Sequence, residues 1–152
     1  MADFKFNVLV VLPERLNVIT TKLGSAAGQA YTDKDKGKLM TMGTVSNFAL
    51  AADGDEIEGW LDNVDGGPPA GGFVVGGVAR PDTGVRIEAQ VAAGAAPVAV
   101  KDLVVAGGQL ALGTKGLPQI KKGTPATFKY RIMRIVSGNG GPGSVVVLER
   151  VA

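Results

Sequence analysis

The clearest hydrophobic pattern in the chain is the strict alternation between Val85 and Val91. Val85, Ile87, Ala89 and Val91 occupy every second position, and polar residues stand between them. Because the side chains of a strand point alternately to opposite faces, a period of two predicts a strand with one buried face and one solvated face. The same period recurs over 128–135, where a late shift of the pattern indicates a bulge.

Elsewhere, short apolar runs are separated by glycine-rich turns. Runs of this length are too short for ordinary helices and predict further strands. The expected strands are 17–23, 39–42, 48–50, 57–64, 73–78, 103–105, 109–112 and 145–148.

Turn residues between these runs predict how neighbouring strands connect. Asp53-Gly54 favours a hairpin, because glycine adopts positive φ without steric cost. Strands 103–105 and 109–112 are expected to form another hairpin around Gly107-Gly108. The segment 66–72 holds two prolines and four glycines and predicts a loop tip, and Gly76-Gly77 indicates a bulge or the close approach of another backbone.

Together these segments predict an all-β protein with a compact β-barrel-like or β-tulip domain of about ten short antiparallel strands. Residues 29–152 form this β-domain. Residues 1–28 are expected to be an extended N-terminal arm or edge strand, because the small-residue segment 24–28 separates them from the main body.

Two apolar features favour contact with another chain. The terminal strand 4–12 alternates at first and then becomes wholly apolar, and it has no pairing partner nearby in sequence. The only tryptophan is an equally good candidate for the core or for an interface. The predicted capsid or oligomer interface residues are Phe4, Phe6, Val8, Val10, Leu12 and Trp60.

Composition removes several classes of function. Cysteine and histidine are both absent, which excludes disulfides, thiolate chemistry, and the commonest general base and metal ligand. A net charge of +2 with scattered basic residues is too small for DNA binding by charge alone. The apolar run 8–12 is too short for a signal peptide or a membrane span, so we expect synthesis and use in a cytoplasm.

Three short segments invite a chemical interpretation, and each has a plainer alternative that we favour. Asp82-Thr83-Gly84 matches the aspartic protease triplet, but Arg80-Pro81 precedes it where those enzymes have an apolar strand, so a β-turn is favoured. The acids of 53–56 fit a solvated turn better than a calcium site. The glycine pairs of 71–77 lack the following helix that a phosphate loop requires.

The charged residues of 31–38 predict a solvated surface loop. A basic bias across 115–134 predicts a solvated face, since no aromatic residues are interleaved with it as a nucleic-acid site would require. No catalytic residue, cofactor site or metal site is predicted.

Three strand and turn patterns carry a family resemblance. DGDEIEGWLDNV at 53–64, GGFVVGGV at 71–78 and VRIEAQV at 85–91 resemble the head decoration, or capsid cement, proteins of tailed bacteriophages. The resemblance extends over 31–150 and takes in LVVAGGQLALGTKGLPQIK at 103–121 and VVVLERV at 145–151.

The resemblance implies a β-domain that binds the outer capsid lattice as a homo-oligomer, a trimer or a dimer. It would bridge neighbouring major capsid proteins, often through an N-terminal arm, and stabilise the shell against packaged DNA. The implied place is the capsid exterior of a virion, made in the host cytoplasm, with no direct nucleic-acid or membrane contact and no catalysis. The alternatives are another virion component such as a tail or fibre β-domain, a small ligand-binding β-barrel, and a dimeric aspartic hydrolase centred on Asp82.

Overall fold

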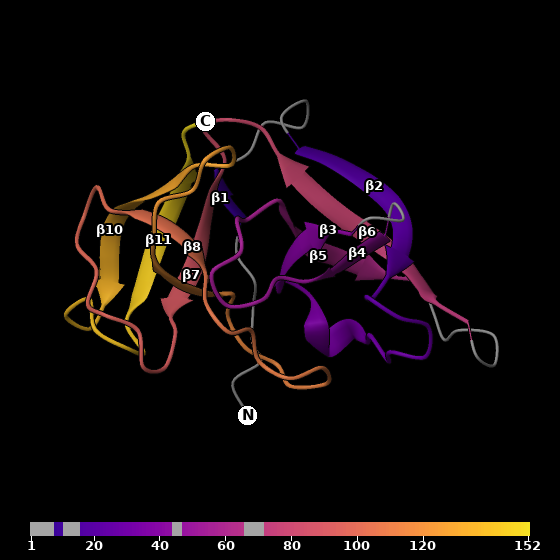
Figure 1. Cartoon of the computed structure of the whole chain (residues 1–152). Helices are drawn as coiled ribbons and strands as arrows, with labels where there is room; N and C mark the ends of the chain where they lie inside the picture. Colours follow the sequence, from indigo (N-terminus) through magenta and orange to yellow (C-terminus); the bar gives the residue numbers. More distant parts are fainter. Residues whose placement is uncertain (1–7, 11–15, 44–46, 66–71) are drawn as a thin grey trace.

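The computed structural model describes residues 8–10, 16–43, 47–65 and 72–152. Its regular structure is almost entirely β (Figure 1). The elements are β1 (Val8–Val10), β2 (Leu16–Leu23), the 3-10 helix η2 (Asp33–Asp35), β3 (Leu39–Met42), β4 (Asn47–Leu50), β5 (Gly59–Val64), β6 (Val74–Pro81), β7 (Arg86–Val91), β8 (Leu103–Ala106), β9 (Gln119–Lys122), β10 (Tyr130–Ser137) and β11 (Val145–Arg150). Apart from β1, ten strands form two five-stranded sheets, which confirms the predicted all-β class.

The first sheet is a closed barrel with the strand order β2-β4-β3-β5-β6. Its pairs are antiparallel except β2–β4, which is parallel and joins only Lys22–Leu23 to Asn47–Phe48. The interior is filled by a cluster of buried apolar side chains. Its members are Leu23, Tyr31, Met40, Phe48, Leu61, Val74 and Val78.

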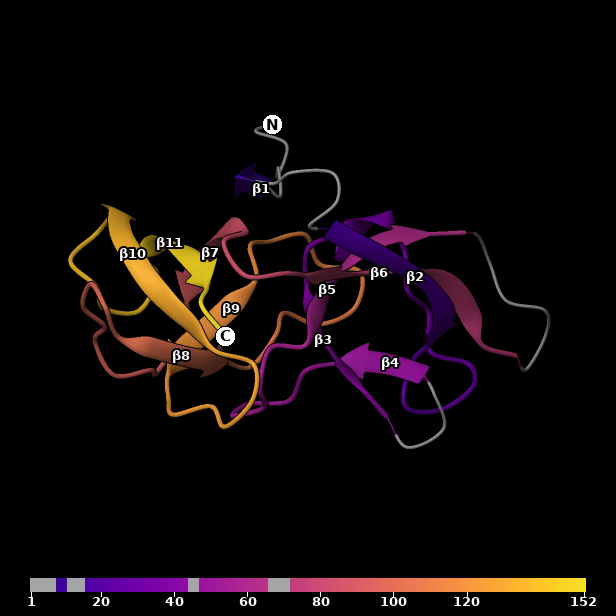
Figure 2. The same ribbon diagram turned by 90° about the horizontal axis from the view of Figure 1, so that it is seen from above.

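The second sheet has the order β7-β11-β10-β8-β9 and stands beside the barrel (Figures 1 and 2). An additional parallel pairing of Gln90–Val91 with Gln119–Ile120 brings its outer strands β7 and β9 together, so the sheet curls. β7 shows the predicted alternation without exception, with Ile87, Ala89 and Val91 buried and the intervening residues half-buried. The bulge expected in β10 is confirmed by a register shift between Ile132 and Arg134.

The contact between the barrel and the second sheet, called the seam below, is largely apolar. Trp60 of β5 lies opposite Ala79 of β6, and both side chains turn away from the barrel interior into the core of the second sheet. Five barrel residues share that buried core. They are Leu39, Ala51, Ile57, Trp60 and Ala79, packed with Val85, Ile87, Val104, Ile120, Tyr130, Ile132 and Leu148 among others.

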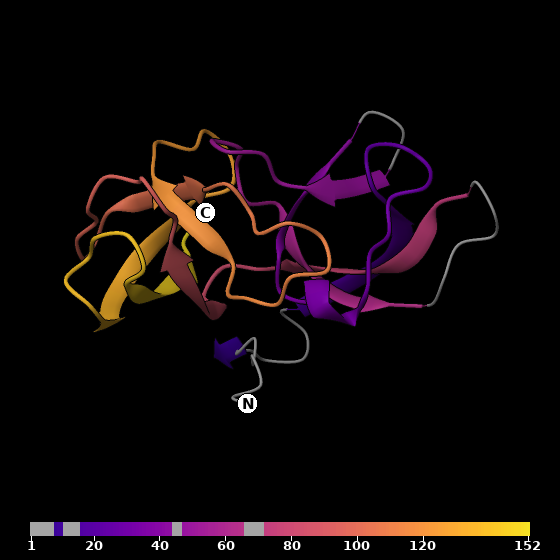
Figure 3. The ribbon, with the colours of Figure 1, turned by 90° about the horizontal axis from the view of Figure 1, so that it is seen from below.

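A buried ion pair fastens one end of the seam. Lys38 Nζ lies 2.5 Å from Asp35 Oδ1, and the two side chains are 1% and 0% exposed. Lys38 also donates to the Ala111 carbonyl at 2.8 Å, and the Gly113 N–H donates to Asp35 Oδ1 at 2.8 Å. Figure 3 shows the segment between β8 and β9 reaching from the second sheet toward the short helix that carries Asp35. The prediction of a solvated loop over 31–38 is therefore wrong for these two charges.

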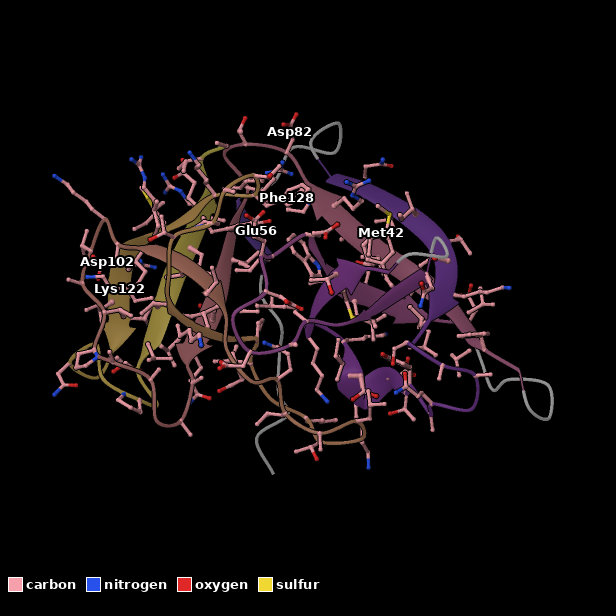
Figure 4. All side chains as sticks on the ribbon, viewed as in Figure 1. Met42, Glu56, Asp82, Asp102, Lys122 and Phe128 are labelled. Atoms are coloured by element: carbon pink, nitrogen blue, oxygen red, sulfur yellow. The ribbon has the colours of Figure 1, made fainter. Side chains whose placement is uncertain are left out.

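An acidic loop of the barrel, 51–58, fastens the other end. Lys121 Nζ donates to Asp53 Oδ2 at 2.7 Å. The Glu56 carboxylate accepts hydrogen bonds from three consecutive backbone N–H groups, those of Ala126, Thr127 and Phe128. Glu56 and Phe128 lie together in Figure 4. These hydrogen bonds lower the pKa of the Glu56 carboxyl, with the Phe128 N–H as the largest cause.

Gly76 and Gly77 confirm the predicted close approach of another backbone. A Cβ on Gly76 would collide with the Asn63 carbonyl oxygen, and one on Gly77 would collide with the Asn63 side chain. The register between β5 and β6 shifts at this point, between Leu61 and Asn63. The glycine pair therefore lets the bulged strand lie directly on β6.

Three predictions about connectivity are wrong. Residues 16–23 are not part of an arm, since β2 pairs with β6 over its whole length. Asp53-Gly54 forms a turn, with Gly54 at φ +96°, but its flanking strands β4 and β5 lie on either side of β3 and do not form a hairpin. Residues 109–112 are not a strand, and β8 instead pairs with β9.

Candidate interaction surfaces

The N-terminal strand β1 lies on the edge of the second sheet. Val8 pairs with Ile87 and Val10 pairs with Arg86, antiparallel and with a register shift between them. Figure 2 shows β1 set apart from the other strands, beside β7. The N-terminal strand, which has no pairing partner nearby in sequence, thus pairs with β7 of the same chain, about 77 residues away. Of the other predicted interface residues, Phe4, Phe6 and Leu12 lie outside the described residues.

β1 and β9 share one edge of β7. β9 occupies Gln90 and Val91, and β1 occupies Arg86 and Ile87, while β11 covers the opposite edge. Two residue pairs are a short ladder for a strand. β1 is therefore the most weakly paired of the strands in the described part of the chain.

Trp60, the remaining predicted interface residue, belongs to the core. Its side chain is 1% exposed and packs in the seam, so it offers no surface to another chain. Trp60 therefore follows the alternative prediction, core packing. The surfaces that it joins are the barrel and the second sheet of one molecule.

Asp82 lies in an exposed β-turn at the top of Figure 4. Its Oδ1 accepts from the Thr83 N–H at 2.8 Å, and its carbonyl accepts from the Val85 N–H at 3.4 Å. The carboxylate thus stabilises the turn between β6 and β7, as the plainer interpretation of the triplet predicts.

The acids of 53–56 diverge rather than converge. Asp53 binds Lys121, Asp55 accepts from the Ala52 N–H at 2.8 Å, and Glu56 binds the backbone of 126–128. Within the described ranges, no group of three or more acidic side chains is arranged to hold a metal ion. The Asp53 and Glu56 carboxylates therefore stabilise the seam, and that of Asp55 stabilises its own loop.

The basic bias of the C-terminal half is partly neutralised. Lys121 pairs with Asp53, and Lys122 Nζ lies 3.3 Å from Asp102 Oδ1, a pair visible in Figure 4. The Ala99 N–H and, to a lesser degree, Lys122 lower the pKa of the Asp102 carboxyl. Arg131 and Arg134 are exposed on the outer side of β10.

Exposed apolar side chains mark surface that the sequence patterns did not single out. Val18 on β2 and Val75 on β6 are 42% and 40% exposed. Val18 lies against the bare backbone of Gly77, whose added Cβ would be 2.9 Å from Val18 Cγ1. The only sequence signal for this patch is the β-branched run 18–21, which is easily taken for an ordinary buried strand.

Comparisons with known proteins give no relative: no family model, no curated protein sequence and no solved structure matches the chain. Among the described residues, no helix has the length and apolar character needed to cross a membrane.

Proposed function

We propose that the protein is a capsid decoration, or cement, protein that binds the outer lattice of a phage head, bridges neighbouring major capsid proteins and stabilises the shell. Its partners are then the major capsid protein and further copies of itself. It acts as a structural component of the virion and not as an enzyme.

One observation supports this proposal above the others: a fastened two-sheet body carries a terminal strand that is held by only two residue pairs. A short strand on a sheet edge can exchange its own sheet for that of a neighbour at small cost, since the same backbone hydrogen bonds form in either place. Lattice binding multiplies such weak contacts, because every copy meets the same neighbours.

The body itself suits a load-bearing role. The seam combines an apolar core with a buried ion pair at one end and a carboxylate bound by three backbone N–H groups at the other. Among the described residues, no three acidic side chains come together in an arrangement that could hold a metal ion. A rigid module without a converging polar site fits a bridging function.

The test is saturable co-sedimentation with undecorated capsids of the phage that encodes the chain. We expect a fixed number of copies per capsid at saturation and a rise in the temperature at which the shell disrupts. Deletion of residues 2–15 should weaken binding at least about tenfold while the far-UV circular dichroism spectrum is kept, because β1 contributes little to the fold.

Val136→Asp is a matched control, since Val136 is a 48% exposed valine of β10, a strand that does not pair with β1. Absence of saturable binding by the full chain would contradict the proposal. Binding unchanged by the deletion would contradict the role assigned to the N-terminal strand.

A further inference from the structure

β2 is paired very unequally on its two sides. On one side, all eight residues from Leu16 to Leu23 pair with β6 in unbroken register. On the other side, only Lys22 and Leu23 pair with β4. In the part of the chain that the structure describes, no strand pairs with 16–21 on the side away from β6. β2 accordingly forms the outer border of the barrel in Figure 1.

The backbone direction identifies which groups face that open side. The Gly24 N–H donates to the Phe48 carbonyl at 2.7 Å, so Gly24 faces β4. Successive residues of a strand direct their N–H and C=O groups to opposite sides. Val18 and Thr20 therefore present their N–H and C=O groups to the open edge, while Ile19 is directed toward β6.

This edge lacks the usual protection against another strand. Natural edge strands carry charges, prolines or bulges that prevent pairing with other chains. Residues 17–21 contain no charge and no proline, and the β2–β6 register has no bulge. Four of the five residues are β-branched, which favours an extended conformation. The first charge, Lys22, lies 5.5 Å from the centre of the Phe73 ring.

Beside Val18, β6 carries no side chain at Gly77. Gly77 has no side chain between Val18 and the Asn63 side chain, and Val18 and Thr20 are both exposed. The outer side chains of Val18 and Thr20 are therefore exposed next to the open edge.

We propose that β2 pairs antiparallel with β2 of a second copy, about a two-fold axis beside Ile19, to make a continuous sheet across the two barrels. A second copy is the occupant because the segment is self-complementary: Val18 meets Thr20 of the partner, and uncharged residues meet uncharged residues from 17 to 21. The inference rests on the proposed function, in which the protein is a homo-oligomer, and β2 would be the surface through which the copies associate. The pairing is expected to form without a capsid.

The first test compares two exposed valines by sedimentation equilibrium of the full chain. The unmodified protein should be a concentration-dependent dimer. Val18→Lys places a charge on the open edge, opposite the uncharged Thr20 of the partner, and should weaken the dimer at least about tenfold. Val75→Lys, at nearly equal exposure on a strand paired on both sides, should leave the dimer constant unchanged, and both variants should keep the circular dichroism spectrum of the parent.

The second test uses the absence of cysteine in the chain. In a register centred on Ile19, an equimolar mixture of Val18→Cys and Thr20→Cys should give a mixed disulfide on mild oxidation, because hydrogen-bonded cross-strand positions lie about 5.5 Å apart at Cα. Either variant alone should cross-link much less.

A monomer at all concentrations would overturn the inference, as would equal weakening by Val18→Lys and Val75→Lys. Efficient self-linking of Val18→Cys alone would overturn the register. A monomeric protein that still binds capsids saturably would refute the β2 pairing but not the decoration function. A dimer that does not bind capsids would refute the decoration function but not the β2 pairing.

Discussion

The barrel and the second sheet differ in charge and in the completeness of their cores. Residues 16–81 hold five Lys and Arg against eight Asp and Glu, a net charge of −3, and residues 82–152 hold nine against four, a net charge of +5. The buried members of the barrel's interior cluster all belong to the barrel, and Leu112 of the other half packs against them. The core of the second sheet needs five residues that the barrel supplies.

This difference shows that the seam is not symmetric. The acidic loop 51–58 contacts Lys121 and the backbone of 126–128 in the positively charged half of the chain, residues 82–152. The opposite net charges of the two halves therefore favour their contact. Loss of the seam would take five buried residues out of the second sheet's core, but would take none of the buried members out of the barrel's interior cluster. We therefore expect the second sheet to depend on the barrel more than the barrel depends on the second sheet.

The largest expected effect comes from Trp60→Ala. Truncation of a buried aromatic side chain of this size should lower the free energy of unfolding by about 3–5 kcal/mol, measured by urea denaturation. Amide exchange should accelerate more at Ile120 and Ile132 of the second sheet than at Met40 and Leu61 of the barrel.

Phe48→Ala is the matched variant on the barrel side, because Phe48 is also 1% exposed but packs in the barrel interior. Its exchange pattern should be the opposite one, with Met40 and Leu61 affected first. Identical patterns for the two variants would mean that the halves unfold as one unit and would refute the asymmetry.

Lys38→Met should be nearly as harmful as Trp60→Ala. It leaves the Asp35 carboxylate buried without its cation, which costs about 3 kcal/mol or more. The double variant Asp35→Asn with Lys38→Met should recover at least half of the loss, since no unpaired charge is left. If the double variant is less stable than Lys38→Met alone, the cost lies in packing and not in charge.

Glu56→Gln should lower the free energy of unfolding by a smaller, pH-dependent amount, about 1 kcal/mol at neutral pH. The substitution replaces a charged acceptor with a neutral one, and partial solvation of the site limits the loss. The folded-state pKa of Glu56 lies below the ordinary value of 4.5 for a glutamate side chain. Its contribution is therefore full above that value and is lost as pH falls through the folded pKa. Unfolding curves of parent and variant should converge in acid, and a constant difference down to low pH would contradict this assignment.

Tyr130→Phe should stabilise the protein slightly or leave it unchanged. Tyr130 is fully buried, and no described group hydrogen-bonds to its Oη. Removing an unsatisfied hydroxyl recovers its desolvation cost, about 1 kcal/mol. A drop in the thermal midpoint would instead indicate a bound water or another partner for the hydroxyl.

The strands themselves were predictable because their signals are local. The alternating segment 85–91 becomes β7 except for its first residue, and the apolar runs at 39–42 and 145–148 lie in β3 and β11. Positive φ at Gly54 follows from its place in a turn. Such features depend on a few neighbouring residues.

Pairing and burial of charge were not predictable in the same way. The closure of β2 against β6 joins segments about 60 residues apart, and the small residues 24–28 suggested a boundary where the barrel continues. The burial of Asp35 and Lys38 depends on carbonyl and N–H groups at 111–113, and nothing within 31–38 indicates that this distant segment covers them. Gln109 binds the backbone of Leu39 and Gln119 in place of forming a hairpin strand.

The position of Trp60 gives the protein a spectroscopic reporter. It is the only tryptophan, and it is buried where the barrel meets the second sheet. Its intrinsic fluorescence emission should be blue-shifted while the two halves are joined and should move to the red when water reaches the indole. Because the chain has no other indole, the wavelength of maximum emission of the isolated protein reports contact between the two halves without any label.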